Sequence, residues 1–80
     1  MDKTTLYDID EITSALVETT LMEVYDALKE KGYNPVSQIV GYLVSGDPGY
    51  ITTHKGARDK ILSLERGKIL EAVVKEYLEN

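Results

Sequence analysis

A cluster of basic side chains is the most distinctive chemical feature of this 80-residue chain. His54, Lys55 and Arg58 lie close together, with Lys60 just beyond, on a protein whose net charge is −5. An arginine fork can hold a carboxylate or phosphate through two parallel hydrogen bonds, so Arg58 is the best candidate for binding an acidic partner. A solvated helix start explains the same cluster, and both interpretations stay open on the residues alone.

Two threonines near the N-terminus, Thr4 and Thr5, carry hydroxyl groups of the kind that a protein kinase modifies. The segment around them, MDKTTLYDID, starts polar, and the sequence predicts a flexible regulatory tail over residues 1–12. A phosphate in this tail would add about −1.5 to −2 charges. On an acidic protein, that charge would either repel a partner or dock the tail onto the cluster around Arg58.

The sequence does not favour catalytic or metal chemistry. Cysteine is absent and there is one histidine, so thiolate metal sites are excluded and a histidine zinc site lacks ligands. The loop over residues 45–50, SGDPGY, lacks the P-loop spacing, and a turn between helices explains it. No carboxylate has an evident base or nucleophile beside it. We therefore expect a protein that is not an enzyme and binds no cofactor.

Composition also limits the partners and the location. The excess of 14 acidic over 9 basic side chains argues against nucleic acid and against anionic lipid surfaces. No apolar run approaches the roughly 20 residues that span a bilayer, and the N-terminus does not resemble a signal peptide. A chain of this size buries only about 60% of its unfolded surface, so a second copy is the expected source of further contacts. These features predict a cytoplasmic homodimer.

The elements that position the candidate residues are all predicted to be helices. Apolar residues at spacings of three and four predict a first helix over residues 14–31, with Gly32 after its end. Asn34 and Pro35 have the types that open a second helix, which runs to about Ser45. Because residues 36–44 are apolar around much of the helix circumference, we expect this helix to be buried on more than one side.

Three further helical segments follow in the second half of the chain. A short turn is predicted over residues 47–51, a helix over 55–66 and a last helix over 68–78. Gly67 is predicted to separate the last two helices. No segment shows the sustained alternation of apolar and polar residues that is typical of a β-strand. The predicted fold is all-α, a compact homodimeric bundle of about five short helices over residues 13–80.

Several sequence blocks match a known pattern. They are VYDAL at 24–28, EKGYNP at 30–35, QIVGYL at 38–43 and SGDP at 45–48. The match continues through Tyr50-Ile51, His54, Ala57-Arg58 and Leu64-Glu65-Arg66, and into the final helix ending at Tyr77-Leu78. Together these blocks resemble the IreB/ReoM family of Gram-positive bacteria, over nearly the whole chain.

The resemblance implies a cytosolic, helical homodimer without known catalytic activity. Members of the family are substrates of a membrane serine/threonine kinase with extracellular PASTA domains and of its cognate phosphatase. The modified residue is a tail threonine ahead of apolar and aromatic residues, which Thr4 matches best, with Thr5 as the alternative. The resemblance further implies restraint of peptidoglycan synthesis. Such proteins promote proteolysis, by a Clp protease, of the UDP-N-acetylglucosamine enolpyruvyl transferase, and phosphorylation relieves this.

This chain departs from the family pattern at the basic surface. Family members usually carry arginine where Thr53 stands, and an arginine pair where Leu62 and Ser63 stand, whereas Arg58 is retained. The basic surface is therefore expected to be thinner than usual. The main alternative function is a structural homodimeric interaction module that no kinase controls.

Overall fold

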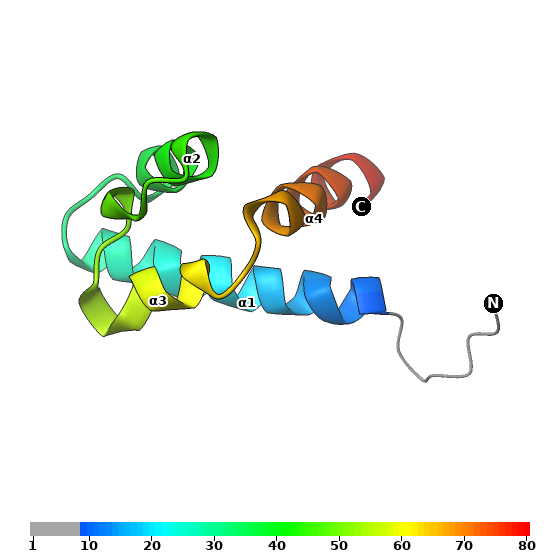
Figure 1. Ribbon diagram of the computed structural model, residues 1–80, viewed down its shortest axis with the longest axis horizontal. Coiled ribbons are helices and arrows are strands. Elements are labelled where there is room, and N and C mark those ends of the chain that lie inside the picture. The colour runs from blue at the N-terminus through cyan, green and yellow to red at the C-terminus, as the bar shows by residue number, and fades with distance from the viewer. Residues whose placement is uncertain (1–8) are drawn as a thin grey trace, which may run out of the picture.

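The computed structural model describes the backbone over residues 9–80, and the side chains from residue 11 onward (Figure 1). Its elements are, in order, α1 (Ile9–Glu30), α2 (Pro35–Ser45), the 3-10 turns η1 (Pro48–Tyr50) and η2 (His54–Gly56), α3 (Ala57–Leu62) and α4 (Arg66–Glu79). Every regular element in this range is helical, which confirms the all-α prediction. Four of them are α-helices rather than the predicted five, because the segment after Asp47 forms only a single 3-10 turn.

The long helix α1 forms the base on which the other helices pack. α3 lies beside its C-terminal half, while α2 and α4 lie on another side of it, at opposite ends (Figure 1). The core is apolar and draws on α1, α2, α3, α4 and the residue that follows η1. Its buried members are Val17, Val24, Ala27, Leu28, Tyr42, Ile51, Ala57, Ile61 and Ile69.

The predicted caps of α2 are confirmed in atomic detail. The Asn34 side chain accepts a hydrogen bond from the backbone N–H of Ser37 at 3.0 Å, and proline occupies the first helical position. At the other end Gly46 adopts φ 77°, a left-handed conformation that glycine adopts without strain, and its N–H bonds to the Tyr42 carbonyl. These local signals determine the bounds of α2.

The first helix begins earlier than predicted. α1 starts at Ile9, so residues 9–12 belong to the helix rather than to the predicted tail over residues 1–12. Glu11 then stands in the first turn, where a negative charge is favourable to the helix dipole. The predicted sites Thr4 and Thr5 lie outside the described residues.

The boundary between the last two helices was also predicted wrongly. α3 ends at Leu62, and Ser63 caps it with N–H bonds to the carbonyls of α3, whereas Gly67 lies inside α4. The break falls at residues 63–65 because Leu64 turns toward the core and Glu65 is extended, with φ −72° and ψ 134°. A glycine inside a helix costs only about 1 kcal/mol, which the packing of α4 on α1 offsets.

The prediction that α2 is buried on more than one side is wrong for the single chain. Val36, Val40 and Val44 are 61%, 50% and 81% exposed, and they form one stripe along the helix. Gly41 does serve a close approach, but the Tyr50 ring from η1, not another helix, occupies the space that a Cβ would need. α2 therefore packs through one face and leaves an apolar face uncovered.

Candidate functional site

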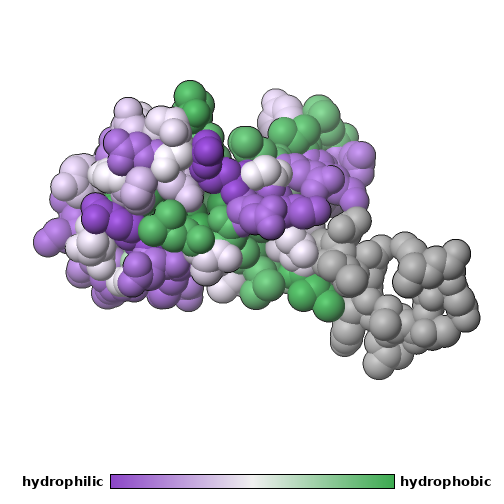
Figure 2. All heavy atoms as spheres, viewed as in Figure 1, coloured by the Kyte–Doolittle hydropathy of each residue, from purple (hydrophilic) through white to green (hydrophobic). Residues whose placement is uncertain are grey.

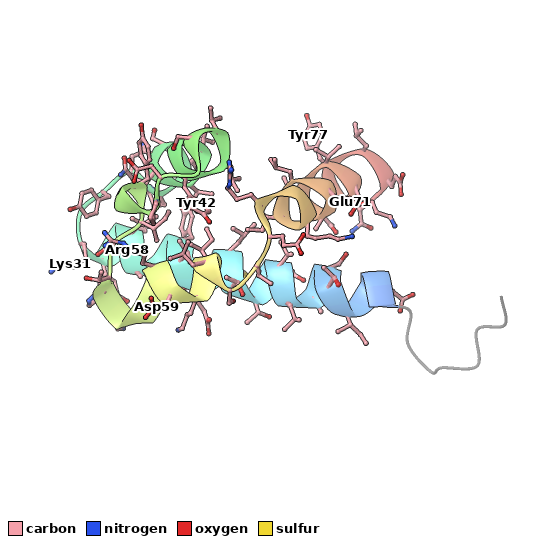
Figure 3. All side chains as sticks on the ribbon, viewed as in Figure 1. Lys31, Tyr42, Arg58, Asp59, Glu71 and Tyr77 are labelled. Carbon is pink, nitrogen blue, oxygen red and sulfur yellow. The ribbon has the colours of Figure 1, made fainter. Side chains whose placement is uncertain are left out.

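The basic cluster lies where η2 joins α3, near the C-terminal end of α1 (Figure 3). The turn before α3 is tight: Lys55 and Gly56 both adopt left-handed backbone conformations, with φ 55° and 72°. For lysine this conformation costs roughly 1–2 kcal/mol, so the surroundings of Lys55 must stabilise it. One contribution comes from the His54 N–H, which donates to the Thr52 hydroxyl oxygen at 3.1 Å.

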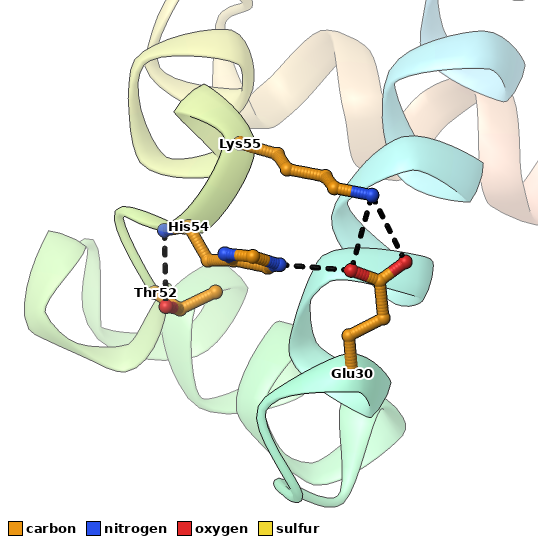
Figure 4. Close-up of polar contacts among 4 residues, drawn as sticks. All are labelled: Glu30, Thr52, His54 and Lys55. Carbon is orange, nitrogen blue, oxygen red and sulfur yellow. Dashed lines mark hydrogen bonds and ion pairs between the residues drawn. The ribbon is translucent and has the colours of Figure 1, made fainter.

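A carboxylate from α1 binds two of the three predicted residues (Figure 4). The His54 Nε2 atom lies 2.8 Å from Glu30 Oε1, and Lys55 Nζ lies 3.2 Å from both carboxylate oxygens. Glu30 ends α1 and thereby ties that helix to η2 across 24 positions of sequence. We call these three residues the Glu30 clamp. It holds the strained turn in place and also neutralises part of the basic charge that an acidic partner would meet.

Arg58 has a different environment. Its side chain is half-buried, and its Nε–H donates to the carbonyl oxygen of Ile51 at 2.8 Å. Neither Asp59 nor Glu65 forms an ion pair with it within the described residues. The bond engages one edge of the guanidinium group, and its two terminal amino groups have no partner among residues 11–80. Those groups keep the geometry that a carboxylate or phosphate requires.

The loop that Arg58 binds is fixed from two sides. The Gln38 side chain, from α2, donates to the carbonyl oxygen of Tyr50 at 3.0 Å, next to the Ile51 carbonyl that Arg58 holds. Gln38 and Arg58 therefore have matching structural roles on adjacent residues. Only Arg58 carries charge, which allows the structural and the binding roles to be separated by experiment.

The three positions at which the resemblance led us to expect arginine, Thr53, Leu62 and Ser63, are all exposed. Thr53 precedes η2, while Leu62 and Ser63 lie at the C-terminal end of α3. Leu62 is 47% exposed, and the Ser63 hydroxyl donates to the Lys60 carbonyl at 2.6 Å. Arginines at these positions would extend the basic surface along α3. Of the arginines that the resemblance leads us to expect on this surface, Arg58 is the one that this chain retains.

Two structurally important residues received no role in the sequence analysis. Glu30 holds η2, and Arg66 donates from Nη1 to the Leu43 carbonyl at 3.0 Å, which joins the start of α4 to the end of α2. Both residues fall inside the blocks that carried the family resemblance. Their partners lie 24 and 23 residues away, so no short-range spacing could reveal the contacts.

The Glu30 clamp predicts a specific pH dependence of stability. Hydrogen bonds from His54 and then Lys55 lower the pKa of the Glu30 carboxyl below its ordinary value of 4.5. The folded state thus favours the charged form more than the unfolded chain does. The clamp contributes stability above about pH 4.5, and this contribution disappears as the pH falls through the lower pKa of the folded state.

Glu30→Gln should therefore melt at a lower temperature than the unmodified protein at pH 6, and the difference should narrow below pH 4.5. Thermal melts followed by circular dichroism between pH 7 and pH 3 measure both quantities. Glu18→Gln, from the same helix and without an ion pair among the described residues, is the matched control for the loss of one negative charge. A difference from the unmodified protein that stays constant down to pH 3 would contradict the clamp.

Comparison with known families identifies the class and then the family. The family model described as "IreB regulatory phosphoprotein" matches residues 2–79. The small helical domain with its exposed basic cluster is thus a regulatory phosphoprotein, in a family of regulators rather than of enzymes. This protein belongs to the IreB family, which confirms the resemblance seen in the sequence blocks. In the described range, no helix has both the length and the apolar character to cross a membrane.

Proposed function

We propose that this chain restrains peptidoglycan precursor synthesis under the control of a PASTA-domain serine/threonine kinase and its cognate phosphatase. It promotes proteolysis of the UDP-N-acetylglucosamine enolpyruvyl transferase by a Clp protease, and phosphorylation of Thr4, or else Thr5, relieves this restraint. The observation that carries the proposal is the extent of the family match. It runs from residue 2 to 79 and so includes both the tail threonines and the whole basic cluster.

In this proposal Arg58 makes the decisive contact with the acidic partner. The Glu30 carboxylate offsets the charge of Lys55 and engages the His54 ring, while the terminal amino groups of Arg58 are not engaged by any residue from 11 to 80. His54 and Lys55 contribute at the margin of the contact. The proposed site of action is the cytoplasm, where the kinase domain, the protease and the transferase meet.

The active form in this proposal is a homodimer. The exposed valine stripe of α2 is matched on α4 by a second apolar surface made of Leu70, Val74 and Leu78, which are 43–72% exposed. Both helices lie on the same side of α1, and Figure 2 shows apolar groups along the edge above them. We call these two stripes the α2/α4 face. A second copy would remove this face from water, the dominant source of free energy in such association.

Incubation with a PASTA-type kinase and ATP tests the regulatory part of the proposal. We expect the intact mass to rise by one phosphate, and fragment analysis to locate it on Thr4 or Thr5. Thr4→Ala and Thr5→Ala, compared with each other, identify the residue. A chain that takes up no phosphate, or takes it up only elsewhere, would instead support the alternative function, a structural homodimeric module without kinase control.

A further inference from the structure

An open groove of about 930 Å³ runs between the first half of α1 and the second half of α4. Its apolar lining comes from both helices and comprises Ala15, Val17, Leu21, Met22, Ala72, Val73 and Tyr77. Figure 1 places the start of α1 and the end of α4 at the same end of the molecule, opposite the Glu30 clamp. The groove therefore begins where the chain enters α1 from residues 1–8, which lie outside the described part of the structure.

The length of α1 determines which surfaces the tail threonines can reach. Ile9 and Glu30 are the two ends of this 22-residue helix, so about 32 Å separates them at a rise of about 1.5 Å per residue. Thr4 is five residues before Ile9. A fully extended chain covers about 17 Å over that distance. The Thr4 backbone consequently falls about 15 Å short of the Glu30 end of α1 in its own chain, so the basic cluster at that end is far from the tail.

The groove, by contrast, is within reach. Leu6 is three residues before Ile9 and can extend about 10 Å from it, while Ala15 lies about 9 Å along α1 from Ile9. Leu6 and Tyr7 are the apolar and aromatic pair of the tail. They match the groove in chemistry as well as in distance, because apolar residues of both helices line it, Ala15 among them.

The rim of the groove is acidic. Glu11 and Glu18 come from α1, Glu76 and Glu79 from α4, and the single cation among the lining residues is Lys75. This rim disfavours a second copy of an acidic chain as the occupant and tolerates a tail whose charged groups nearly cancel. It also repels added negative charge: a phosphate on Thr4 or Thr5 brings about −1.5 to −2 charges beside these carboxylates.

From these observations we propose that residues 1–8 dock along the groove of their own chain through Leu6 and Tyr7, and that phosphorylation of Thr4 or Thr5 expels them. The inference rests on the proposed function for the identity of the modified residues. It adds the physical mechanism by which a phosphate changes the position of the tail. The phosphate acts by repulsion at the α1/α4 end of the molecule, and not by attraction to the basic cluster at the other end.

Paramagnetic relaxation on the full chain tests this docking. The chain contains no cysteine, so Asp2→Cys carries a single nitroxide label, and 15N spectra report which amides lie near it. We expect strong broadening at Ala15, Glu18, Val73 and Tyr77, and none at His54–Arg58. A chain assembled with phosphothreonine at position 4 should lose most of that broadening. Val73→Glu, which places a carboxylate on the groove wall, should lose it without phosphate, whereas Leu62→Glu on α3 should not.

Several outcomes would overturn the proposal. One is broadening at the basic cluster, and another is groove broadening that the phosphate leaves unchanged. A third is groove broadening that appears only when label and 15N are on different chains, which would assign the groove to the tail of a partner. Because the phosphothreonine is built in by synthesis, the experiment does not depend on the kinase. Failure of the kinase assay and failure of tail docking are thus separate results.

Discussion

In the proposed function, Arg58→Ala should abolish the lowering of the enolpyruvyl transferase level in cells, while the purified variant still folds and forms the proposed dimer. A two-pronged contact between the terminal amino groups and a partner carboxylate contributes about 1.5–3 kcal/mol. Its loss weakens binding by roughly 10- to 150-fold, since about 1.4 kcal/mol is tenfold. Transferase turnover, followed by immunoblot after protein synthesis is stopped, measures the effect.

The structure supplies a matched control for this experiment. Arg58→Ala also removes the hydrogen bond to the Ile51 carbonyl, which contributes about 1 kcal/mol to stability. Gln38→Ala removes the equivalent bond to the adjacent Tyr50 carbonyl without changing the charge. If Gln38→Ala keeps full activity, the charge of Arg58 is what matters. Equal loss in both variants would show that the loop conformation is what the partner requires, and unchanged turnover in Arg58→Ala would make the cluster ordinary solvated surface.

Val40→Glu should convert the proposed dimer into a monomer. Val40 is the middle residue of the exposed stripe on α2, and the substitution places a carboxylate on the α2/α4 face. Burial of an unpaired polar group costs at least ~2 kcal/mol, and in a twofold symmetric interface the substitution occurs on both chains. We expect the dimer dissociation constant to rise by roughly 700-fold, as about 4 kcal/mol implies at tenfold per about 1.4 kcal/mol. Sedimentation equilibrium at micromolar concentration measures this constant.

Leu62→Glu is the matched control for dimerisation, because it places the same charge at an exposed apolar position of α3, outside the α2/α4 face. It should remain dimeric. Circular dichroism should show that both variants keep their helices, since neither side chain belongs to the buried core. A single 9.0 kDa species for the unmodified protein would contradict the homodimer itself. An equal response in both variants would place the interface elsewhere.

The length of α1 separates the basic cluster from the point where residues 1–8 join the helix. The basic cluster lies at one end and the entry of residues 1–8 at the other, about 32 Å apart along the helix. In the proposed function, phosphorylation therefore controls a partner surface that the phosphate itself does not contact within the chain. The groove and the α2/α4 face share α4. In the two proposals, the docked tail and the second copy therefore contact the same helix.

Local signals alone determined much of the helical pattern. The cap residues Asn34 and Gly46 define α2 as predicted, because each satisfies backbone groups within four residues of itself. The apolar spacing along α1 also predicted the helix itself, and three of the residues with that spacing, Val17, Val24 and Leu28, are buried. The family blocks, read as a pattern, identified the IreB family before any fold was known.

Only the tertiary structure decided which apolar residues are covered and which charges are paired. Residues 36–44 are apolar on most sides, and sequence cannot tell which side a neighbour covers; packing against α1 and Tyr50 leaves the valine stripe outside. The break between α3 and α4 moved from Gly67 because the turn of Leu64 toward the core outweighs a small helix propensity. The contact of Glu30 with His54 and Lys55 likewise depends on tertiary packing. Residues 24 positions apart become neighbours only when the helices pack.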